Sequence, residues 1–275
     1  MMKTIKNIAV AVDFSNNSRS AYKYAKALAK HVDAQVQLIH IYSVPVNPYS
    51  TNGLGFIPNI DQQVKETMTT LRRFAHDKSV KCSIYTGFPA NKLVELSKDH
   101  NFDLLIVGNS GDRGLLSQLF GSVAMEVAKK AQCPVLLVPY KAKYKDITDI
   151  VYTTSELSAI EGGIAVAKDW ATTFDAKIHF VHVENSDSNA QNIDIHTFMK
   201  NSNINYDYKD LDFVTVRGAI DEYCGQKPIN LIVSMTQNYS FWDSLFHQST
   251  TNALAWNSRL PLLVLHKEVI EAKMG

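Results

Sequence analysis

Cysteine is scarce in this sequence, and its scarcity limits the kinds of site that the chain can hold. The 275 residues include three cysteines, Cys82, Cys133 and Cys224, which lie far apart. An odd and scattered set gives no disulfide framework and no C-x-x-C metal motif, and it is typical of a reducing compartment. We therefore expect a cytoplasmic protein, and we predict no metal-ligating residues.

Long apolar runs and basic runs are also missing. No apolar stretch approaches the ~20 residues that a membrane helix needs. The net charge is +1, and no Lys/Arg cluster stands out, which argues against nucleic acid as the main partner. The opening "MMKTIKNIAVAVDFS" has a short apolar core that runs into Asp13 and no small-residue cleavage site, so it predicts a strand and not a signal peptide.

The chain contains an internal repeat. "KNIAVAVDFS" is echoed by "TDIVYTTSEL", and "AQVQLIHIYS" by "AKIHFVHVEN", both at one offset that places His40 over His182. Further along the chain, "CPVLLVP" in the first copy corresponds to "LPLLVLH" in the second. We therefore predict two domains, 1–142 and 143–275, each of ordinary domain size. We also expect the strands after Pro134 and Pro261 to pair within one chain as an intramolecular pseudo-dimer, because each would otherwise leave an open sheet edge.

Short β-branched runs alternate with helical patterns in both halves, which is typical of an α/β fold with a parallel sheet. Ser15 and Asn16 are candidate caps for the first helix. The prediction is two tandem doubly wound five-stranded parallel sheets, of strand order 3-2-1-4-5, with helices on both faces. The expected strands are 5–13, 34–42, 80–86, 102–108 and 134–139, then 148–154, 176–183, 211–216, 229–235 and 261–266; helices of the first half are expected at 16–32, 60–78, 90–100 and 122–132.

Glycine is sparse overall but concentrated in one place. Four of the 12 glycines, at 108, 111, 114 and 121, fall within "VGNSGDRGLLSQLFGSVAM", Val107–Met125. Doubly wound sheets bind ligands beyond the carboxyl ends of their strands, where the strand order reverses. Asp13 and Gly108 end two such strands, while Gly121 and Ser122 open the next helix, whose N-terminus favours phosphate. Gly114 alone is best explained as a loop glycine.

The spacing Gly108-x2-Gly111-x9-Gly121-Ser122 resembles the nucleotide motif of the universal stress protein family, in its ATP-binding branch. The strand motifs "VAVDFS", "LIHIYS" and "CPVLLVP", and the segment "TGFPANKLVELS", extend the resemblance over two tandem copies. It implies ATP as the ligand, often with a divalent ion, Mg²⁺ or Mn²⁺, beside the phosphates. The binding residues that it implies are Ala11, Val12, Asp13, Ile41, Val107, Gly108, Gly111, Gly121, Ser122 and Val123.

The sequence departs from the family pattern in two ways. Ser110 stands where Arg or His is frequent, and Asp112 where Arg is frequent; Asp112 would repel phosphate unless it helps to hold a metal ion. The second copy diverges further. By alignment of the repeats, Ser155, Ser234, Gln237 and His247 replace Asp13, Gly108, Gly111 and Gly121, and the aromatic-rich "QNYSFWDSLFHQS" replaces the glycine loop. We interpret the second site as degenerate; its aromatic residues could form another pocket, an interface or a packed loop.

The other groups of polar residues in the sequence indicate structural roles and not metal binding or catalysis. His179 and His182 lie three apart on a predicted strand and so point to opposite faces, which favours structural histidines over a metal pair. No Ser/His/Asp or Cys/His arrangement is legible, and Arg113 is the only cation in the glycine loop, so no catalytic residue is predicted.

These features predict a stress-response protein that binds an adenine nucleotide as a regulatory or sensing ligand. Two alternatives stay open: a slow ATPase or phosphotransferase, and a protein-interaction module that needs no nucleotide. A homodimer of whole chains and an unidentified protein partner are compatible with the sequence, and no membrane association is expected.

Overall fold

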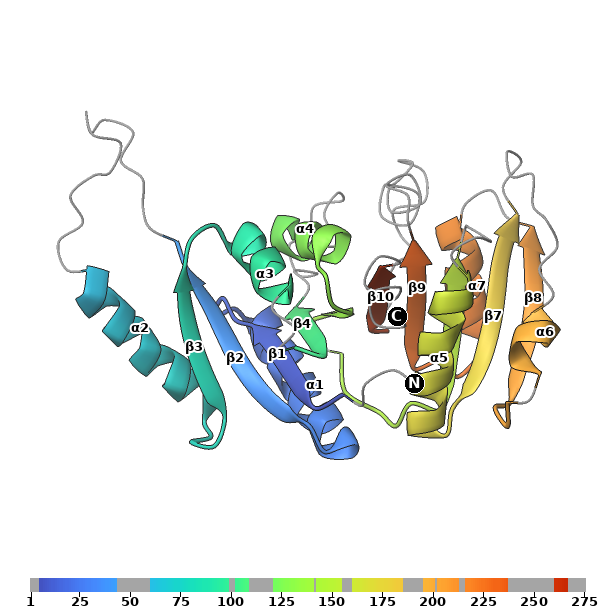
Figure 1. Cartoon of the computed structure of the whole chain (residues 1–275), viewed down its shortest axis with the longest axis horizontal. Helices are drawn as coiled ribbons and strands as arrows, with labels where there is room; N and C mark the ends of the chain where they lie inside the picture. Colours follow the sequence, from blue (N-terminus) through green and yellow to red (C-terminus); the bar gives the residue numbers. More distant parts are fainter. Residues whose placement is uncertain are drawn as a thin grey trace, which may run out of the picture.

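A computed structural model describes residues 5–43, 60–98, 102–108, 121–140, 142–154, 160–184, 195–200, 202–212, 216–236 and 260–266. In the described residues, strands and helices alternate through most of each half of the chain (Figure 1). The first unit contains β1(Asn7–Ala11), α1(Asn16–Val32), β2(Gln35–Tyr42), α2(Ile60–Ala75), β3(Lys81–Thr86), α3(Pro89–Lys98), β4(Leu104–Gly108), α4(Ser122–Lys130) and β5(Val135–Val138). The second contains β6(Asp149–Thr154), α5(Ile160–Phe174), β7(Lys177–Glu184), α6(Ile195–Met199), β8(Tyr206–Asp212), α7(Val216–Gln226), β9(Leu231–Thr236) and β10(Leu262–His266).

The strands form one sheet of ten, in the order β3-β2-β1-β4-β5-β10-β9-β6-β7-β8. Each unit therefore has the predicted order 3-2-1-4-5, and all strand pairs within a unit are parallel. The predicted α/β fold is confirmed. The segment 142–148, which contains the predicted domain boundary, connects β5 to β6.

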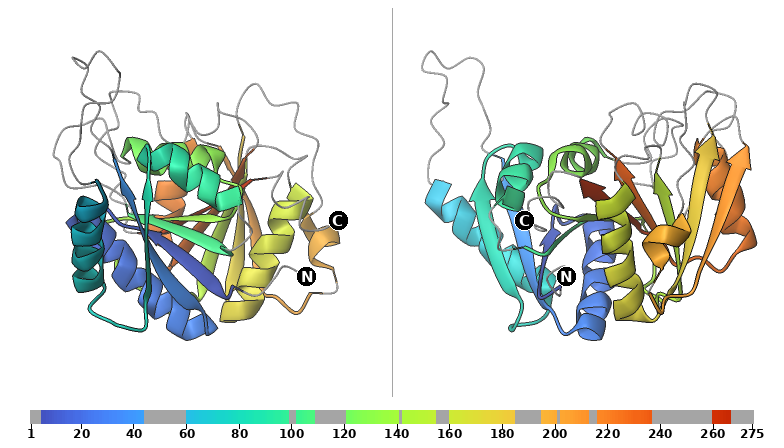
Figure 2. Two further views of the ribbon diagram at one scale, coloured as in Figure 1. Left: turned by 60° about the vertical axis from the view of Figure 1, so that its left-hand side comes forward. Right: turned by 45° about the vertical axis from the view of Figure 1, so that its right-hand side comes forward.

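The two units meet along β5 and β10, which pair antiparallel with Leu136 opposite Leu263. Both leucines are fully buried. The predicted pairing of the strands after Pro134 and Pro261 is therefore confirmed. On one face of this seam α1 lies beside α5 (Figure 2), where the rings of His31 and Phe174 are 5.0 Å apart.

Helices cover both faces of the sheet, as expected for strands that are apolar on both sides. One core contains Leu28 of α1, Leu71 of α2 and Trp170 of α5, together with strand residues such as Ile8 of β1 and Ile178 of β7. The other contains helices α3, α4 and α7, packed against the alternate residues of the strands, such as Ala9. Among the described residues, no helix combines the length and apolar character that would cross a membrane.

Hydrogen bonding at the strand starts shows how the two units correspond. Asp103 Oδ2 accepts from the backbone N–H groups of Lys6 and Asn7, each at 2.9 Å. Asn230 Oδ1 accepts from those of Thr148 and Asp149 at 2.8 and 3.0 Å. Asn230 is therefore the counterpart of Asp103.

This correspondence corrects one sequence alignment. Counting from Asp103 and Asn230, Ser234 corresponds to Val107 and Met235 to Gly108. The sheet register agrees, because Ile8 pairs with Leu104 and Ile150 pairs with Leu231. The prediction that Ser234 replaces Gly108 was wrong by one residue.

One strand is also misplaced by the sequence prediction. The expected strand 211–216 is found at Tyr206–Asp212, and a helix begins at Val216. β8 is the edge strand of the sheet, and Tyr208, Lys209 and Asp210 are exposed on it. An edge strand carries polar side chains that a search for buried apolar runs does not find.

Candidate functional site

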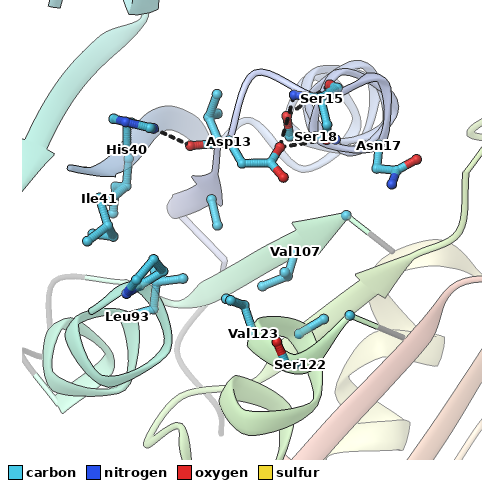
Figure 3. Close-up of a pocket in the computed structure, with 17 residues that line it drawn as sticks. Asp13, Ser15, Asn17, Ser18, His40, Ile41, Leu93, Val107, Ser122 and Val123 are labelled. Atoms are coloured by element: carbon cyan, nitrogen blue, oxygen red, sulfur yellow. Dashed lines mark hydrogen bonds between the residues drawn. The ribbon is translucent and has the colours of Figure 1, made fainter. Parts of the chain in front are cut away.

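A cavity of about 240 Å³ lies beyond the carboxyl ends of β1, β2 and β4, between the strands and the N-terminal ends of α3 and α4 (Figure 3). β1 is the strand at which the chain changes direction across the sheet, so this is the topological switch point of the first unit. The cavity is lined by Ala11, Val12, Asp13, Ser15, Asn17, Ser18, Ile39, His40, Ile41, Pro89, Leu93, Val107, Gly108, Gly121, Ser122, Val123 and Ala124.

Asp13 is the only acidic residue among the described residues that line the cavity. Its Oδ1 accepts from the backbone N–H of Ser15 at 3.0 Å and from the Ser15 hydroxyl at 2.6 Å. Burial works to raise the pKa of Asp13, but hydrogen bonds from Ser15 and Ser18 outweigh it and lower that pKa below 3.8. Asp13 is therefore a carboxylate at neutral pH, held against the first turn of α1.

Ser15 also caps α1, as its sequence position predicts. It has extended backbone angles, and its side chain accepts from the N–H of Ser18. The same residue thus fixes both the helix start and the carboxylate of Asp13.

His40 lies on β2 and forms part of the cavity wall. Its Nδ1 lies 2.7 Å from the Val12 carbonyl oxygen, which can only accept, so Nδ1 carries the proton. The His40 ring packs against that of Phe14 in a tilted arrangement, with the centroids 4.6 Å apart, and Phe14 has a positive φ of 65° where the chain turns from β1 into α1. The sequence indicated a structural histidine here, and the structure adds that it lines the cavity.

Gly108 has a structural reason to be glycine. A β-carbon at this position would lie 2.6 Å from the Asn17 carbonyl oxygen and 3.0 Å from the Ser18 nitrogen. The first turn of α1 therefore approaches the end of β4 so closely that no side chain fits. From the sequence, Gly108 was expected to make room for a ligand. The sequence did not indicate that it also makes room for the backbone of α1.

Gly121 precedes α4 as its N-cap, with extended backbone angles (φ −61°, ψ 153°) and no capping side chain. Helix N-termini leave backbone N–H groups without intrahelical partners, and no side chain among the described residues caps those of α4. Ser122 is the first helical residue and is exposed. Val127 of α4 and Ala131, which caps its C-terminus, are buried, whereas Val123 is half-buried.

Nine of the ten residues implied by the resemblance line this one cavity, from Ala11, Val12 and Asp13 to Gly121, Ser122 and Val123. The tenth, Gly111, lies outside the described residues, as do Ser110, Asp112 and the loop 44–59. Sequence reasoning did not assign Asn17, Ser18, Ile39, Pro89, Leu93 and Ala124 to the site. Pro89 and Leu93 belong to the quoted segment "TGFPANKLVELS", which could have indicated them.

The corresponding place in the second unit has different walls. Thr153 and Ser234, paired across β6 and β9, replace Ala11 and Val107. Both side chains are buried, and neither hydroxyl has a hydrogen-bond partner among the described residues. Ser155, Gln237 and His247 lie outside the described residues.

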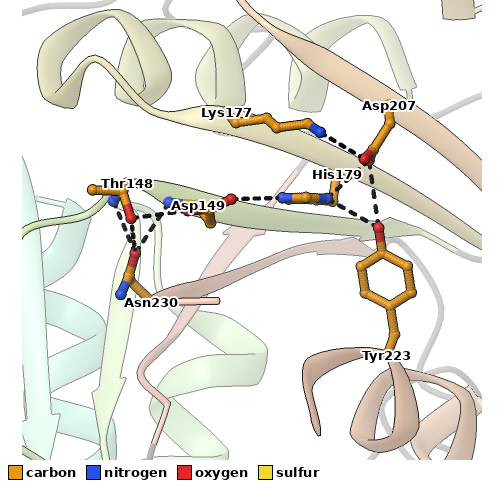
Figure 4. A network of polar contacts seen from close by, with 7 residues as sticks. All are labelled: Thr148, Asp149, Lys177, His179, Asp207, Tyr223 and Asn230. Atoms are coloured by element: carbon orange, nitrogen blue, oxygen red, sulfur yellow. Dashed lines mark hydrogen bonds and ion pairs between the residues drawn. The ribbon is translucent and has the colours of Figure 1, made fainter. Parts of the chain in front are cut away.

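A separate polar network in the second unit surrounds His179, which is 2% exposed (Figure 4). Its Nε2 lies 2.9 Å from Asp149 Oδ1, and its Nδ1 lies 2.8 Å from Asp207 Oδ1 and 2.9 Å from the Tyr223 hydroxyl. Burial, and then the charge of Asp207, raises the pKa of Tyr223 to about 12. These groups satisfy one another and join β6, β7, β8 and α7, so we interpret the network as structural.

Comparison with known proteins agrees with this geometry. The sequence profile described as "Universal stress protein family" matches residues 4–139. A universal stress protein of Methanocaldococcus jannaschii is 34% identical over 140 residues, which are 48% of this chain and 81% of that protein. The chain belongs to the universal stress protein family. The universal stress protein YxiE of Bacillus subtilis is 30% identical over 141 residues, covering 47% of this chain and 95% of that protein.

The tandem arrangement also has a solved counterpart. The crystal structure of a universal stress protein from Archaeoglobus fulgidus superimposes with a TM-score of 0.70 over 95% of this chain and 98% of its own. The two are 16% identical, so this likeness shows the universal stress protein fold of the whole chain and not a shared ligand.

Proposed function

We propose that the first unit binds ATP, or a closely related adenine nucleotide, as a regulatory or sensing ligand in a cytoplasmic stress response. The supporting observation is that the residues implied by the ATP-binding motif, which come from four separate segments of the chain, surround one cavity at the switch point of the sheet. Its volume of about 240 Å³ lies just below the usual range of small-molecule pockets, which begins at roughly 300 Å³.

The β2 side of the cavity offers backbone groups to a base. The Ile39 carbonyl accepts from the Val12 N–H at 2.8 Å. Backbone groups two residues apart on a strand face the same neighbour, so those of Ile41 face the edge that β1 has left beyond Ala11. A base placed there would contact Ile41, as the resemblance implies.

The α4 side suits phosphate. The N–H groups at the start of α4 and the positive end of its dipole face an anion without competition from a cap side chain. Mg²⁺ or Mn²⁺ would depend mainly on phosphate oxygens, because Asp13 is the one carboxylate among the described lining residues, and the described residues contain no cluster of three metal-ligating side chains.

Calorimetric titration with ATP, and with GTP for base selectivity, tests the proposal on the wild type and on Gly121→Val. The valine branches would cover the N–H groups of α4, so ATP affinity should fall at least tenfold while the far-UV spectrum stays unchanged. Gly225→Val is the matched control, because a β-carbon at Gly225 meets nothing within 4 Å. Binding by neither nucleotide in the wild type would support the interaction-module alternative.

The enzyme alternative is decided by phosphate release. Multiple-turnover release that disappears in Gly121→Val would indicate a slow ATPase, whereas binding without release supports a regulatory ligand.

A further inference from the structure

A second cleft, of about 270 Å³, opens between the two units and shares no residue with the nucleotide cavity. Four parts of the chain form it: Tyr24 of α1, the connecting segment after β5, the residues just before β9, and those just before β10. The polar side chains in its wall are those of Tyr24, Lys143, Lys145 and Asn230. The cleft therefore joins both units and the segment that connects them.

Asn230 presents donors to this cleft. Its Oδ1 is fixed by two backbone N–H groups, those of Thr148 and Asp149, which can only donate. The orientation of the amide is therefore determined, and its Nδ2 is turned away from these donors (Figure 4). Nδ2 has no hydrogen bond within the described part of the chain. The counterpart in the first unit, Asp103, has a carboxylate in this role, which would offer an acceptor and a negative charge instead.

Tyr24 contributes a second donor. The residue is 3% exposed and packs edge-on against Tyr144, with ring centroids 5.3 Å apart. Its hydroxyl makes no hydrogen bond among the described residues. Burial raises the pKa of Tyr24, so the hydroxyl keeps its proton.

Lys143 and Lys145 supply positive charge. Both are exposed, and neither forms an ion pair with a described residue. None of the described residues that line the cleft is acidic. The acidic residues nearest to the two lysines in sequence are Asp146 and Asp149. Asp149 already pairs with His179, whose Nε2 lies 2.9 Å from Asp149 Oδ1. The polar wall thus consists of two ammonium groups, an amide nitrogen and a phenol hydroxyl, all of which can donate.

We propose that this cleft binds a small multivalent oxyanion, of the phosphate or polycarboxylate type, through Lys143, Lys145, Asn230 and Tyr24. An oxyanion accepts several hydrogen bonds at once and matches a set of donors that carries positive charge. The residues that would contact the anion come from both units and from the segment between them. Binding would therefore stabilise the folded arrangement of the two units by mass action.

The test uses the full chain carrying Gly121→Val, so that the nucleotide cavity does not contribute. Inorganic phosphate and citrate are titrated separately at constant ionic strength, with binding followed by calorimetry and the midpoint of thermal unfolding. At least one of the two anions should bind in the millimolar range or tighter and raise the midpoint. The stronger of them identifies phosphate or carboxylate as the natural chemistry.

Two variants locate the site. Asn230→Asp keeps an acceptor for the two backbone N–H groups but replaces the donor with a carboxylate, so affinity should fall about tenfold or more, equal to about 1.4 kcal/mol. Lys143→Gln with Lys145→Gln should give a similar loss. Lys65→Gln with Lys78→Gln changes the net charge equally at exposed positions away from the cleft and should leave binding unchanged.

The proposal is overturned if neither anion binds, or if both cleft variants bind as well as the exposed-lysine control. Equal losses in the cleft and control variants would also overturn it, because they would indicate a general effect of net charge.

Discussion

Gly108 at the end of β4 and Asn17 in the first turn of α1 both line the cavity of the first unit, and a β-carbon on Gly108 would lie 2.6 Å from the Asn17 carbonyl oxygen. The end of β4 is thus pressed against the first turn of α1, the turn that also holds Asp13 through Ser15. The glycine sets the position of the helix, and the helix sets the position of the carboxylate.

Gly108→Ala should therefore destabilise the fold and weaken ATP binding together. The obstructing atoms are backbone, which cannot rotate away, so we expect a loss of about 1–3 kcal/mol in the free energy of unfolding, measured by urea denaturation. Gly225→Ala is the control. It meets nothing within 4 Å and should be neutral or stabilise by up to about 1 kcal/mol. Wild-type stability of Gly108→Ala would show that the close contact is not maintained in solution.

Asp13 should make a pH-dependent contribution to stability at acid pH. Its pKa in the folded protein is below 3.8, so the unfolded chain binds the proton more readily. The stabilisation is present above about pH 4 and is lost as the pH falls through the folded pKa. The melting temperatures of wild type and Asp13→Asn should therefore differ at pH 6 and converge towards pH 2–3. A difference that stays constant over this range would contradict the assignment.

Much of this crevice could be predicted from sequence because parallel strands end at a common edge. Once Asp13 and Gly108 end two neighbouring strands, their proximity follows from the topology. The packing partner of Gly108 could not be predicted in the same way, since it requires the distance between α1 and β4. The alignment of Ser234 with Gly108 failed for a related reason: one residue of slip changes the face on which a strand residue lies, and only the sheet register decides it.

Where β6 contacts α5, the second unit has a larger strand residue and a smaller helix residue than the first unit has at the corresponding positions. By the repeat offset, Tyr152 and Gly163 replace Val10 and Ala21 of the first unit. The Tyr152 hydroxyl is buried and has no hydrogen bond within the described part of the chain, and a β-carbon on Gly163 would overlap it. The small residue on the helix accommodates the large one on the strand.

A double-mutant cycle tests this size relationship. Tyr152→Val should cost about 2–5 kcal/mol through the cavity that it leaves, and Gly163→Ala about 1–3 kcal/mol through overpacking. The double variant restores the pair found in the first unit, so it should be more stable than the sum predicts by about 1–3 kcal/mol. Met235 Sδ, 2.5 Å from the added β-carbon, belongs to a flexible side chain that can move. As a control, the stability changes of Tyr152→Val and Gly225→Ala should add. Coupling between these two positions, or no coupling between Tyr152 and Gly163, would contradict the proposed size relationship.

Each chain should bind one ATP. In the second unit, Met235 stands where Gly108 allows the helix to approach in the first, and Thr153 and Ser234 replace the apolar walls formed by Ala11 and Val107. A nucleotide held as in the first unit would lose both the close approach of the helix to the strand end and the apolar surface of the crevice. Calorimetry with ATP should therefore give a stoichiometry near one per chain, and Gly121→Val should weaken that single site and leave no second site of wild-type affinity. Two comparable sites, or a full site remaining in Gly121→Val, would show that the second unit binds nucleotide despite these replacements.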